Sequence, residues 1–242
     1  MPWTYKEREL VAAIKAGSIS DTKKALEAGA DVNAINGYET VFVYVCRVED
    51  VASKTEIIQL LLDYDADVNA TGRFKCTPLM YTCANPNITP EIIQLLLDHG
   101  ADVNAKDNDW WTPLMYACAN RHSESEILHK IIKILVKYKA DLNEINKYDR
   151  TALMYALDND NMESKTKKLL IKRGADINPY NCWSEREVLR MEQKLNAMQR
   201  EMIADMTKDI TKLEAQQAWN KFQAKKIAKQ RMSALKLGQY RT

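Results

Sequence analysis

A short phrase made of Ala, Asp, an aliphatic residue and Asn recurs five times and constrains the fold more than any other feature of this chain. Its copies begin at Ala30, Ala66, Ala101, Ala140 and Ala175. The Asp residues of successive copies are separated by 36, 35, 39 and 35 residues. A period in this range is the signature of stacked repeats, whose neighbouring units share one continuous core. Such proteins present an extended surface to a partner.

A second phrase that opens with Thr keeps the same spacing. Near copies read Thr-Pro-Leu-Met from Thr77 and Thr112, and degenerate versions start at Thr40 and Thr151. Thr caps the free amides of a helix and Pro tolerates the first helical position, so each copy predicts a helix start. A Leu- and Ile-rich stripe at helical spacing follows each copy and predicts a second helix in every unit.

Together the two phrases resemble the ankyrin repeat, which opens with Thr-Pro-Leu-His-x-Ala and closes with Leu-Leu-x-x-Gly-Ala-Asp-x-Asn. The resemblance covers residues 4–183 and implies an all-α solenoid of helix-turn-helix repeats with hairpin fingers. The units expected in residues 1–183 are a capping repeat at 4–33 and repeats at about 38–70, 75–104, 110–143 and 149–178. The resemblance also implies that a protein partner binds at the fingers and the concave face.

The chain departs from the family pattern at two kinds of position. The His that supports the turn in the family is replaced by Val43, Met80, Met115 and Met154. Met is expected only to fill space there. The Gly that ends the second helix, a position that favours a left-handed residue, is kept at Gly29, Gly100 and Gly174 but replaced by Asp65 and Lys139.

Three of the five cysteines occupy one equivalent site, six residues after the Thr of their repeat. These are Cys46, Cys83 and Cys118, at a position that is usually Ala in the family. We expect them to be small buried thiols rather than disulfide partners. The chain has neither a Cys-x-x-Cys pair nor Cys and His at ligand spacing, so no metal site and no cofactor are predicted.

Catalysis finds no support in the sequence. The three His residues lie in different contexts, and there is no phosphate-binding loop or nucleophile motif. Asp107 and Asp109 are expected to be solvated finger residues rather than an acid/base pair. We therefore predict a protein that is not an enzyme and has no small-molecule substrate.

Each finger carries an aromatic residue that its turn does not need. These residues recur at nearly equal spacing and are Tyr38, Phe74, Trp110, Tyr148 and Trp183. Trp110 stands where the family has Gly, Trp111 follows it, and Arg73, Lys75 and Arg150 add cations beside the rings. Aromatic residues are enriched at binding hot spots, which predicts that the fingers bind a partner. Alternatively, the rings lie flat on the neighbouring finger and shield its backbone.

Residues 184–242 predict a long C-terminal helix. Ser184 and Glu187 form a capping-box signal, and strong helix formers follow without Pro or Gly as far as Leu237. Apolar residues then recur in steps of three and four, as in a coiled coil. This seam includes Leu195, Met198, Met202, Met206, Ile210 and Leu213. Through residues 188–213 the helix can pair with a second copy, fold back on the solenoid or receive a partner helix.

The charge of the chain is divided between its two parts. Residues 184–242 contain 13 Lys and Arg against 7 Asp and Glu, so they carry +6, and the net +2 of the chain leaves −4 for residues 1–183. A basic tail ends the chain, with Lys221, Lys225, Lys226, Lys229, Arg231 and Lys236. Residues 219–241 suit an acidic protein groove, RNA, DNA or a ribonucleoprotein, or an anionic membrane surface. They could also be a solvated helix end.

No apolar run approaches the ~20 residues of a membrane span, so membrane insertion is not expected. Charged residues at the N-terminus argue against a signal peptide and favour a cytoplasmic location, with delivery into a host cell left open. The sequence thus predicts an interaction scaffold, adaptor or regulator that binds one partner through its fingers and a second partner, or itself, through the C-terminal helix. The alternative is a nucleic-acid- or ribosome-associated factor anchored by the basic tail.

Overall fold

The computed structural model describes residues 3–48 and 53–176, together with positions 193, 194, 196–198, 200, 201 and 204. The chain divides into two units, Met1–Met191 and Glu192–Thr242. The described positions of the second unit are helical. Apart from them, the predicted helix over 184–242 lies outside the described residues.

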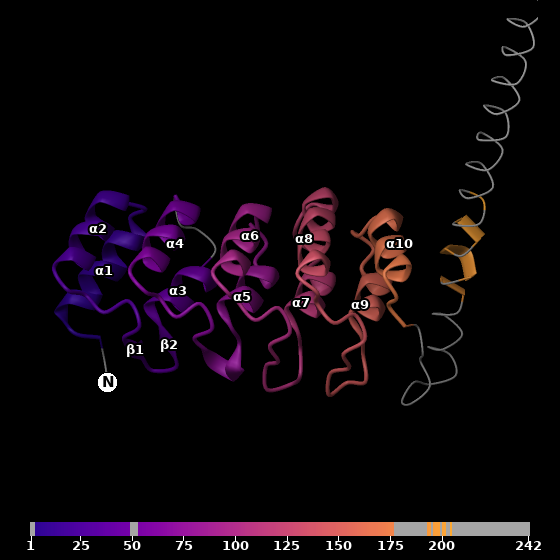
Figure 1. Ribbon diagram of the computed structural model, residues 1–242, viewed down its shortest axis with the longest axis horizontal. Helices are drawn as coiled ribbons and strands as arrows, with labels where there is room; N and C mark the ends of the chain where they lie inside the picture. The colour runs from indigo at the N-terminus through magenta and orange to yellow at the C-terminus, as the bar shows by residue number, and fades with distance from the viewer. Residues whose placement is uncertain are drawn as a thin grey trace, which may run out of the picture. The chain divides into compact units, whose positions relative to one another are not determined.

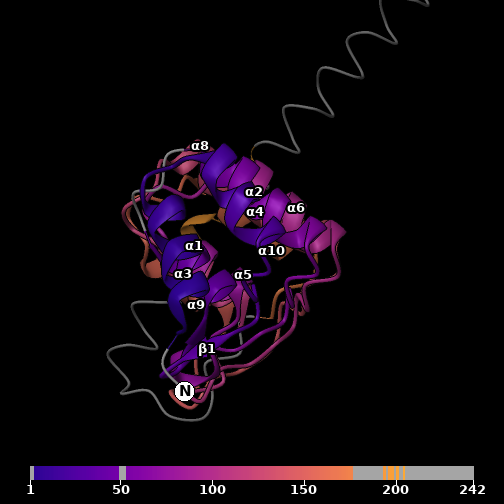
Figure 2. The ribbon, with the colours of Figure 1, turned by 90° about the vertical axis from the view of Figure 1, so that its left-hand side faces the viewer.

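Ten α-helices form five stacked pairs in the described part of the first unit, and we call these pairs repeats 1 to 5 (Figure 1). In chain order the pairs are α1 (Tyr5–Lys15) and α2 (Ile19–Glu27), α3 (Val41–Arg47) and α4 (Lys54–Asp63), α5 (Pro78–Ala84) and α6 (Pro90–Asp98), α7 (Pro113–Ala119) and α8 (Ser125–Lys137), and α9 (Ala152–Asp158) and α10 (Ser164–Lys172). Figure 2 shows the first and second helices of the repeats as two stacks, with the fingers extending to one side. We call α1, α3, α5, α7 and α9 the inner helices and α2, α4, α6, α8 and α10 the outer helices.

Fingers connect each repeat to the next and span residues 34–39, 70–76, 105–111 and 144–150. The first is a small antiparallel hairpin in which β1 (Ile35–Asn36) pairs with β2 (Glu39–Thr40). The second contains the short 3₁₀ turn η1 (Arg73–Lys75). The predicted all-α solenoid with hairpin fingers is confirmed for the described repeats.

The Thr phrase starts the first helix of repeats 2 to 5, as predicted. The hydroxyl oxygens of Thr40, Thr77, Thr112 and Thr151 accept from backbone N–H groups three residues later, at 3.2, 3.3, 3.3 and 3.4 Å. Each bond satisfies an amide that has no partner within the helix.

Two of the Met residues that replace the family His do more than fill space. The sulfur of Met80 accepts from the backbone N–H of Thr77 at 3.3 Å, and Met154 does the same for Thr151 at 3.4 Å. A thioether sulfur is a weak acceptor. Here it accepts from the backbone N–H of a buried Thr. The expectation of pure space filling is wrong at these two positions.

The outer helices end in left-handed residues whether or not Gly is present. Gly29, Gly100 and Gly174 have φ of 84°, 85° and 96°. Asp65 and Lys139 take the same region, with φ of 59° and 65°. Because a side chain disfavours this conformation, the two substituted stops carry a conformational cost of about 1 kcal/mol each.

The predicted cysteine site is a buried stack between neighbouring inner helices. Cys46, Cys83 and Cys118 are completely buried free thiols, as expected. Burial raises the pKa of Cys46 to about 12 and raises the pKa of Cys83 and Cys118 strongly. These thiols therefore stay protonated and unreactive at neutral pH.

The Asp-x-Asn phrase joins successive repeats along one edge of the stack. The Asn33 amide donates to the carbonyl oxygen of Asp65 at 2.9 Å, and its oxygen accepts from the N–H of Asp67 at 2.8 Å. The same pair of bonds recurs at Asn69, Asn104 and Asn143. In repeat 1 the Glu7 carboxylate accepts a hydrogen bond from the N–H of Asp31 at 3.2 Å. Glu7 therefore takes the place that the Asn of the preceding repeat has in the later repeats.

A second Asn ladder, which is buried, joins the ends of the inner helices. Asn120 donates to the carbonyl oxygens of Cys83 and Asn85 at 3.1 and 3.0 Å. Asn159 repeats this one unit later, on Cys118 and Asn120, at 3.0 and 2.8 Å. Both side chains bridge to the preceding repeat, which aligns the inner helices and holds the fingers in register.

Candidate protein-binding surface

The third and fourth fingers are each built around one buried polar side chain. An Asp107 carboxylate oxygen accepts from the N–H groups of Asp109 and Trp111, both at 2.8 Å, and the Tyr116 hydroxyl donates to the other oxygen at 2.7 Å. Asp107 is 7 % exposed, so its predicted solvated position is wrong. It is a structural group that shapes the finger and ties it to α7.

Asn146 has the same role one repeat later. Its side-chain oxygen accepts from the N–H groups of Tyr148 and Arg150 at 3.0 and 3.1 Å, and its amide donates to the Tyr155 hydroxyl at 2.8 Å. Neighbouring fingers are also joined through the backbone: Lys147 donates to Asp109 at 3.0 Å and Asn108 donates to Phe74 at 2.8 Å. The fingers therefore form a linked row rather than separate loops.

A row of half-buried tyrosines lies where the inner helices meet the fingers. Tyr44, Tyr81, Tyr116 and Tyr155 each stand four residues after the Thr of their repeat. Burial raises the pKa of Tyr81, Tyr116 and Tyr155, so their hydroxyls stay protonated donors. The sequence analysis missed this row, although its constant spacing from the Thr phrase was a signal that could have found it.

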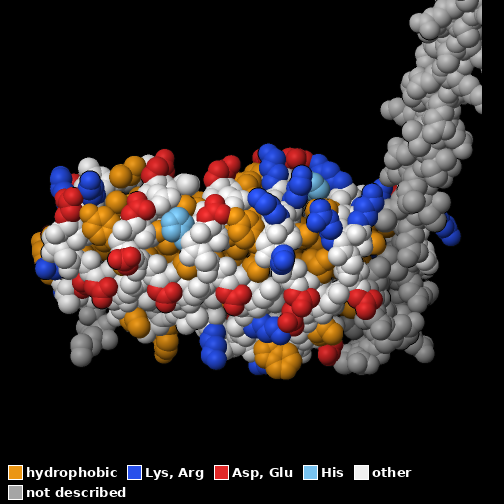
Figure 3. Space-filling model, viewed as in Figure 1, with side chains coloured by type: hydrophobic (Ala, Val, Ile, Leu, Met, Phe, Trp, Pro, Cys, Tyr) orange, Lys and Arg blue, Asp and Glu red, His pale blue; other side chains and the backbone are white. Residues whose placement is uncertain are grey.

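Four of the predicted finger aromatics are strongly exposed. Tyr38 and Phe74 are each 69 % exposed, Trp110 is 52 % exposed and Tyr148 is 59 % exposed. Figure 3 shows large hydrophobic side chains along the edge of the solenoid where the fingers end. These four rings do not bury themselves on the neighbouring fingers, and we call them the fingertip aromatics.

The backbone beneath the fingertip aromatics is strained. Phe74, Lys75, Trp110 and Asp149 have φ of 58°, 62°, 62° and 53°. Glycine adopts this region freely, whereas side chains raise the energy of the conformation. The sequence thus keeps residues with side chains at positions where the backbone conformation favours Gly.

A hollow on the fingertips brings together four of the predicted site residues. Tyr38, Arg73, Phe74 and Lys75 line it together with Asn108, and its volume is about 600 Å³. The Arg73 guanidinium lies 5.3 Å from the centre of the Tyr38 ring, so the side chain spans from the second finger to the first. Arg73 and Lys75 are exposed and their charge gives the hollow a positive rim. Asn108 is the lining residue that the sequence analysis did not identify.

Trp111 and Arg150 lie elsewhere and have internal partners. The Trp111 ring is half-buried and its centre is 5.1 Å from that of Tyr116 and 4.4 Å from that of Tyr155. Arg150 stacks on Tyr155 at 4.2 Å and pairs with Asp158. Trp110 and Trp111 are therefore not an exposed pair. Trp110 is exposed, whereas Trp111 packs between tyrosines of repeats 4 and 5.

The remaining predicted site residues lie outside the described residues. These are Trp183, the seam residues Leu195, Met202, Met206, Ile210 and Leu213, and the whole basic tail. Met198 is the described member of the seam, and it is 7 % exposed.

Two features of the described residues limit the chemistry of this part of the chain. None of its helices is both long and apolar enough to cross a membrane. Nor do three or more His, Cys, Asp and Glu residues come together there in a group that could hold a metal ion.

Comparison with known families agrees with the geometry. The family described as "Ankyrin repeats (3 copies)" matches residues 10–107, 49–128 and 90–181, which together span most of the described solenoid. A comparison with curated proteins gives no match. Ankyrin repeats generally mediate protein–protein interactions, and the Asn ladders, capped inner helices and finger row found here are the framework of such a stack. The chain therefore belongs to the ankyrin-repeat family.

Proposed function

We propose that this protein is a non-enzymatic interaction adaptor that grips a protein partner with its fingertips. The observation that carries the proposal is the exposure of Tyr38, Phe74, Trp110 and Tyr148 at corresponding places on four successive fingers. Rigid aromatic side chains give large contact area at low entropic cost, and exposed apolar rings in a row are a mark of an interaction site.

The fingertip hollow indicates the chemistry of the partner. Its floor is aromatic, and its two charged lining residues, Arg73 and Lys75, are both cations. An apolar side chain flanked by carboxylates matches this combination, because the ring faces and the cations are then satisfied together. We infer that the partner presents a hydrophobic segment with acidic neighbours.

The C-terminal part supplies a second proposed contact. Its support is the sequence alone, namely the apolar seam over residues 188–213 and the basic tail over residues 219–241. We propose that residues 184–242 form a separate helical segment that engages a second partner or a second copy. Binding to RNA or DNA through the tail is the alternative, which retention on nucleic acid at low salt would reveal.

Affinity capture with the full chain tests the fingertip proposal. The partner captured by the wild-type protein is identified by mass spectrometry, and capture is then repeated with Phe74→Ser and Trp110→Ser combined. The proposal requires loss of that partner with an unchanged unfolding transition. A matched control replaces Tyr5, a 69 % exposed aromatic residue on α1, with Ser and should capture normally. Equal capture by both variants would contradict the proposal.

A further inference from the structure

The solvent-facing positions of the outer helices α4, α6, α8 and α10 change from acidic to basic between repeats 3 and 4, whereas α2 exposes Lys23, Lys24 and Glu27. Repeats 2 and 3 place Glu, Gln, Leu and Asp at four equivalent positions, which are Glu56, Gln59, Leu60 and Asp63 in α4 and Glu91, Gln94, Leu95 and Asp98 in α6. At the same positions repeats 4 and 5 place Lys, Lys, an aliphatic residue and Lys. These are Lys130, Lys133, Ile134 and Lys137 in α8 and Lys165, Lys168, Leu169 and Lys172 in α10.

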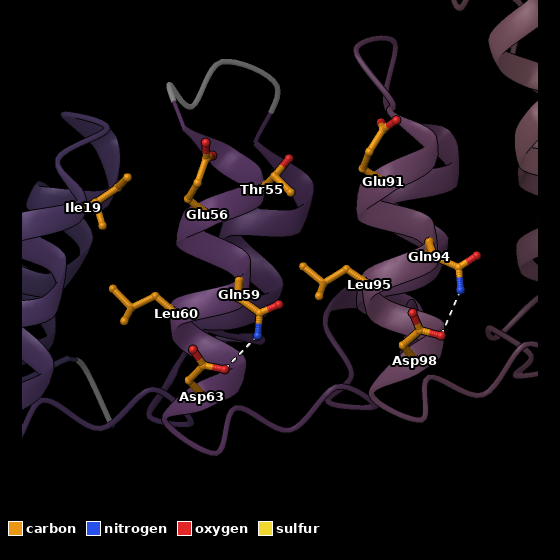
Figure 4. A pocket seen from close by; sticks show the side chains of 10 residues that line it. All are labelled: Ile19, Thr55, Glu56, Gln59, Leu60, Asp63, Glu91, Gln94, Leu95 and Asp98. Atoms are coloured by element: carbon orange, nitrogen blue, oxygen red, sulfur yellow. Dashed lines mark hydrogen bonds between the residues drawn. The ribbon is translucent and has the colours of Figure 1, made fainter.

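Two grooves with apolar residues in their lining open on this surface, one mainly over repeats 2 and 3 and one across the boundary between repeats 3 and 4. Figure 4 shows Leu60 and Leu95 between the outer helices, with Glu56 and Glu91 towards one end of the groove and Asp63 and Asp98 towards the other. We call repeats 2 and 3 the acidic half. The next groove is lined by Pro90, Gln94 and Ile134 among lysines 130, 133, 137 and 139. We call repeats 4 and 5 the basic half, and Figure 3 shows Lys and Arg side chains gathered over α8 and α10.

Two carboxylates of the acidic half, Asp63 and Asp98, are held by neutral hydrogen-bond donors, and the charge of Lys137 on the neighbouring α8 also acts on Asp98. Gln59 donates to Asp63 at 2.7 Å, Gln94 donates to Asp98 at 2.8 Å, and the Tyr138 hydroxyl also donates to Asp98. These neutral donors hold the two carboxylates in place. Four carboxylates thus stand beside six lysines on one face, and one of these lysines, Lys165, already pairs with Glu126 and Glu163.

We infer that this outer face is a self-complementary surface on which a second copy of the chain docks with two-fold symmetry. A two-fold axis between repeats 3 and 4 places α6 of one copy against α8 of the other, and α4 against α10. Every acidic position then meets a lysine, and the apolar residues Leu95 and Ile134 meet along the middle. An isologous interface requires one patch that matches itself when reversed, and an order of acid, acid, base, base has this property.

The second copy explains the pattern better than a different partner does. Charges spread for solubility have no reason to keep identical positions within each half and to change sign at one boundary. A basic helix would use only the acidic half, and an acidic helix only the basic half. A reversed copy of the same face uses both halves at once. This surface is separate from the fingertips, so a dimer would present two sets of fingers.

Paired charge reversals in the full chain test the inference. The acid-swapped chain carries Glu91→Lys and Asp98→Lys, and the base-swapped chain carries Lys130→Glu and Lys137→Glu. All four positions are exposed. By sedimentation velocity at low salt, wild type should form dimers that weaken as salt rises, because surface charges are screened. Each swapped chain should dimerise at least tenfold more weakly, and an equimolar mixture of the two should recover a one-to-one dimer.

The mixture is the decisive experiment. Each swapped chain repels a copy of itself, and the two chains attract one another only if the acidic half of one copy docks on the basic half of the other. A wild-type monomer at all concentrations contradicts the inference, as does a dimer that survives both swaps, which would assign self-association to residues 188–213. Loss in the acid-swapped chain alone would place the basic tail in the acidic half, and assemblies larger than dimers would exclude the two-fold arrangement. Both results contradict the inference.

Symmetric cross-linking locates the axis independently. Gln94 lines both grooves and lies nearest the proposed axis. In a Cys182→Ser background, Gln94→Cys should link to itself with a short bismaleimide. The matched control Gln59→Cys should not, since two copies of α4 would be separated by three helix spacings, about 25–30 Å. A mixture of Gln59→Cys and Lys168→Cys chains should link to each other. Self-linking of Gln59→Cys without Gln94→Cys would overturn the arrangement.

Discussion

Asn120 donates from its buried side-chain amide to the carbonyl oxygen of Cys83 in the preceding repeat, at 3.1 Å. Its oxygen accepts from the N–H groups of His122 and Ser123 at 3.0 and 3.1 Å, so the side chain organises the turn that leads into α8 as well. This residue couples one repeat to the next at a site that water does not reach.

Asn120→Ala should lower the free energy of unfolding by about 1–3 kcal/mol, because it leaves buried carbonyl and N–H groups without partners. Asn104→Ala is the matched control. It removes a similar pair of inter-repeat bonds, but at an exposed site where water can replace them. Urea unfolding followed by circular dichroism measures both changes. Equal losses of unfolding free energy in the two variants would show that the buried ladder stabilises the stack no more than the exposed one.

Lys139→Gly should stabilise the solenoid by roughly 0.5–1 kcal/mol, because it relieves the left-handed strain at the end of α8. Its control is Lys133→Gly within the same helix, which should destabilise by about 1 kcal/mol since Gly is a poor helix former. Thermal unfolding of the three proteins gives the comparison. Destabilisation by Lys139→Gly would show that the φ of 65° carries no cost.

Met80→Leu should destabilise by about 1 kcal/mol, because it removes the sulfur that accepts from the buried Thr77 N–H. Met80→His, which restores the family residue, should recover the loss. Met115→Leu serves as the control, since no sulfur–amide bond joins Met115 to Thr112 among the described residues. Chemical unfolding distinguishes the variants. If Met80→Leu and Met115→Leu are equivalent, the sulfur acts only by filling space.

Glu7 should make the stability of the first repeat depend on pH. The Thr4 hydroxyl chiefly, with the N–H groups of Asp31 and Thr4, holds the pKa of the Glu7 carboxyl below its usual range. A lowered folded-state pKa gives stability that is present above the unfolded value of about 4.3 and is lost as pH falls through the folded value.

The measurement compares unfolding of wild type and Glu7→Gln across acidic pH. Wild type should be more stable near neutral pH, and the difference should shrink as the solution is acidified below about pH 4. Glu9→Gln, which changes an exposed carboxyl on the same helix, should show a smaller difference. A gap between wild type and Glu7→Gln that stays constant with pH would contradict the proposed role of ionised Glu7.

The repeat order and helix starts could be predicted because they depend on local signals. Thr77 and Thr112 cap helices wherever they precede an apolar stripe, and the spacing of the Asp-x-Asn phrase sets the stacking. The burial of Asp107 could not be predicted, because it depends on Tyr116 reaching back from the next helix. In the same way, the sequence places Trp111 beside Trp110, but its ring packs on Tyr155, which is 44 residues further along the chain.

The charge reversal of the outer face was present in the sequence but could not be recognised as a surface. Its residues are mixed with buried ones, and only the placement of α4, α6, α8 and α10 side by side shows that Glu91 and Lys130 hold equivalent positions. The identity of the partner could not be predicted, because a repeat surface is generic and the fold does not specify its ligand.

Trp110→Gly tests the central claim most directly, because it separates folding from binding at one residue. Trp110 has a φ of 62° and is 52 % exposed, so Gly should relieve backbone strain while removing the ring. We expect an unfolding midpoint equal to or above that of wild type. We also expect at least a tenfold weaker affinity for the captured partner, measured by titration calorimetry, which corresponds to about 1.4 kcal/mol. Unchanged affinity in a folded Trp110→Gly protein would contradict binding through the fingertips.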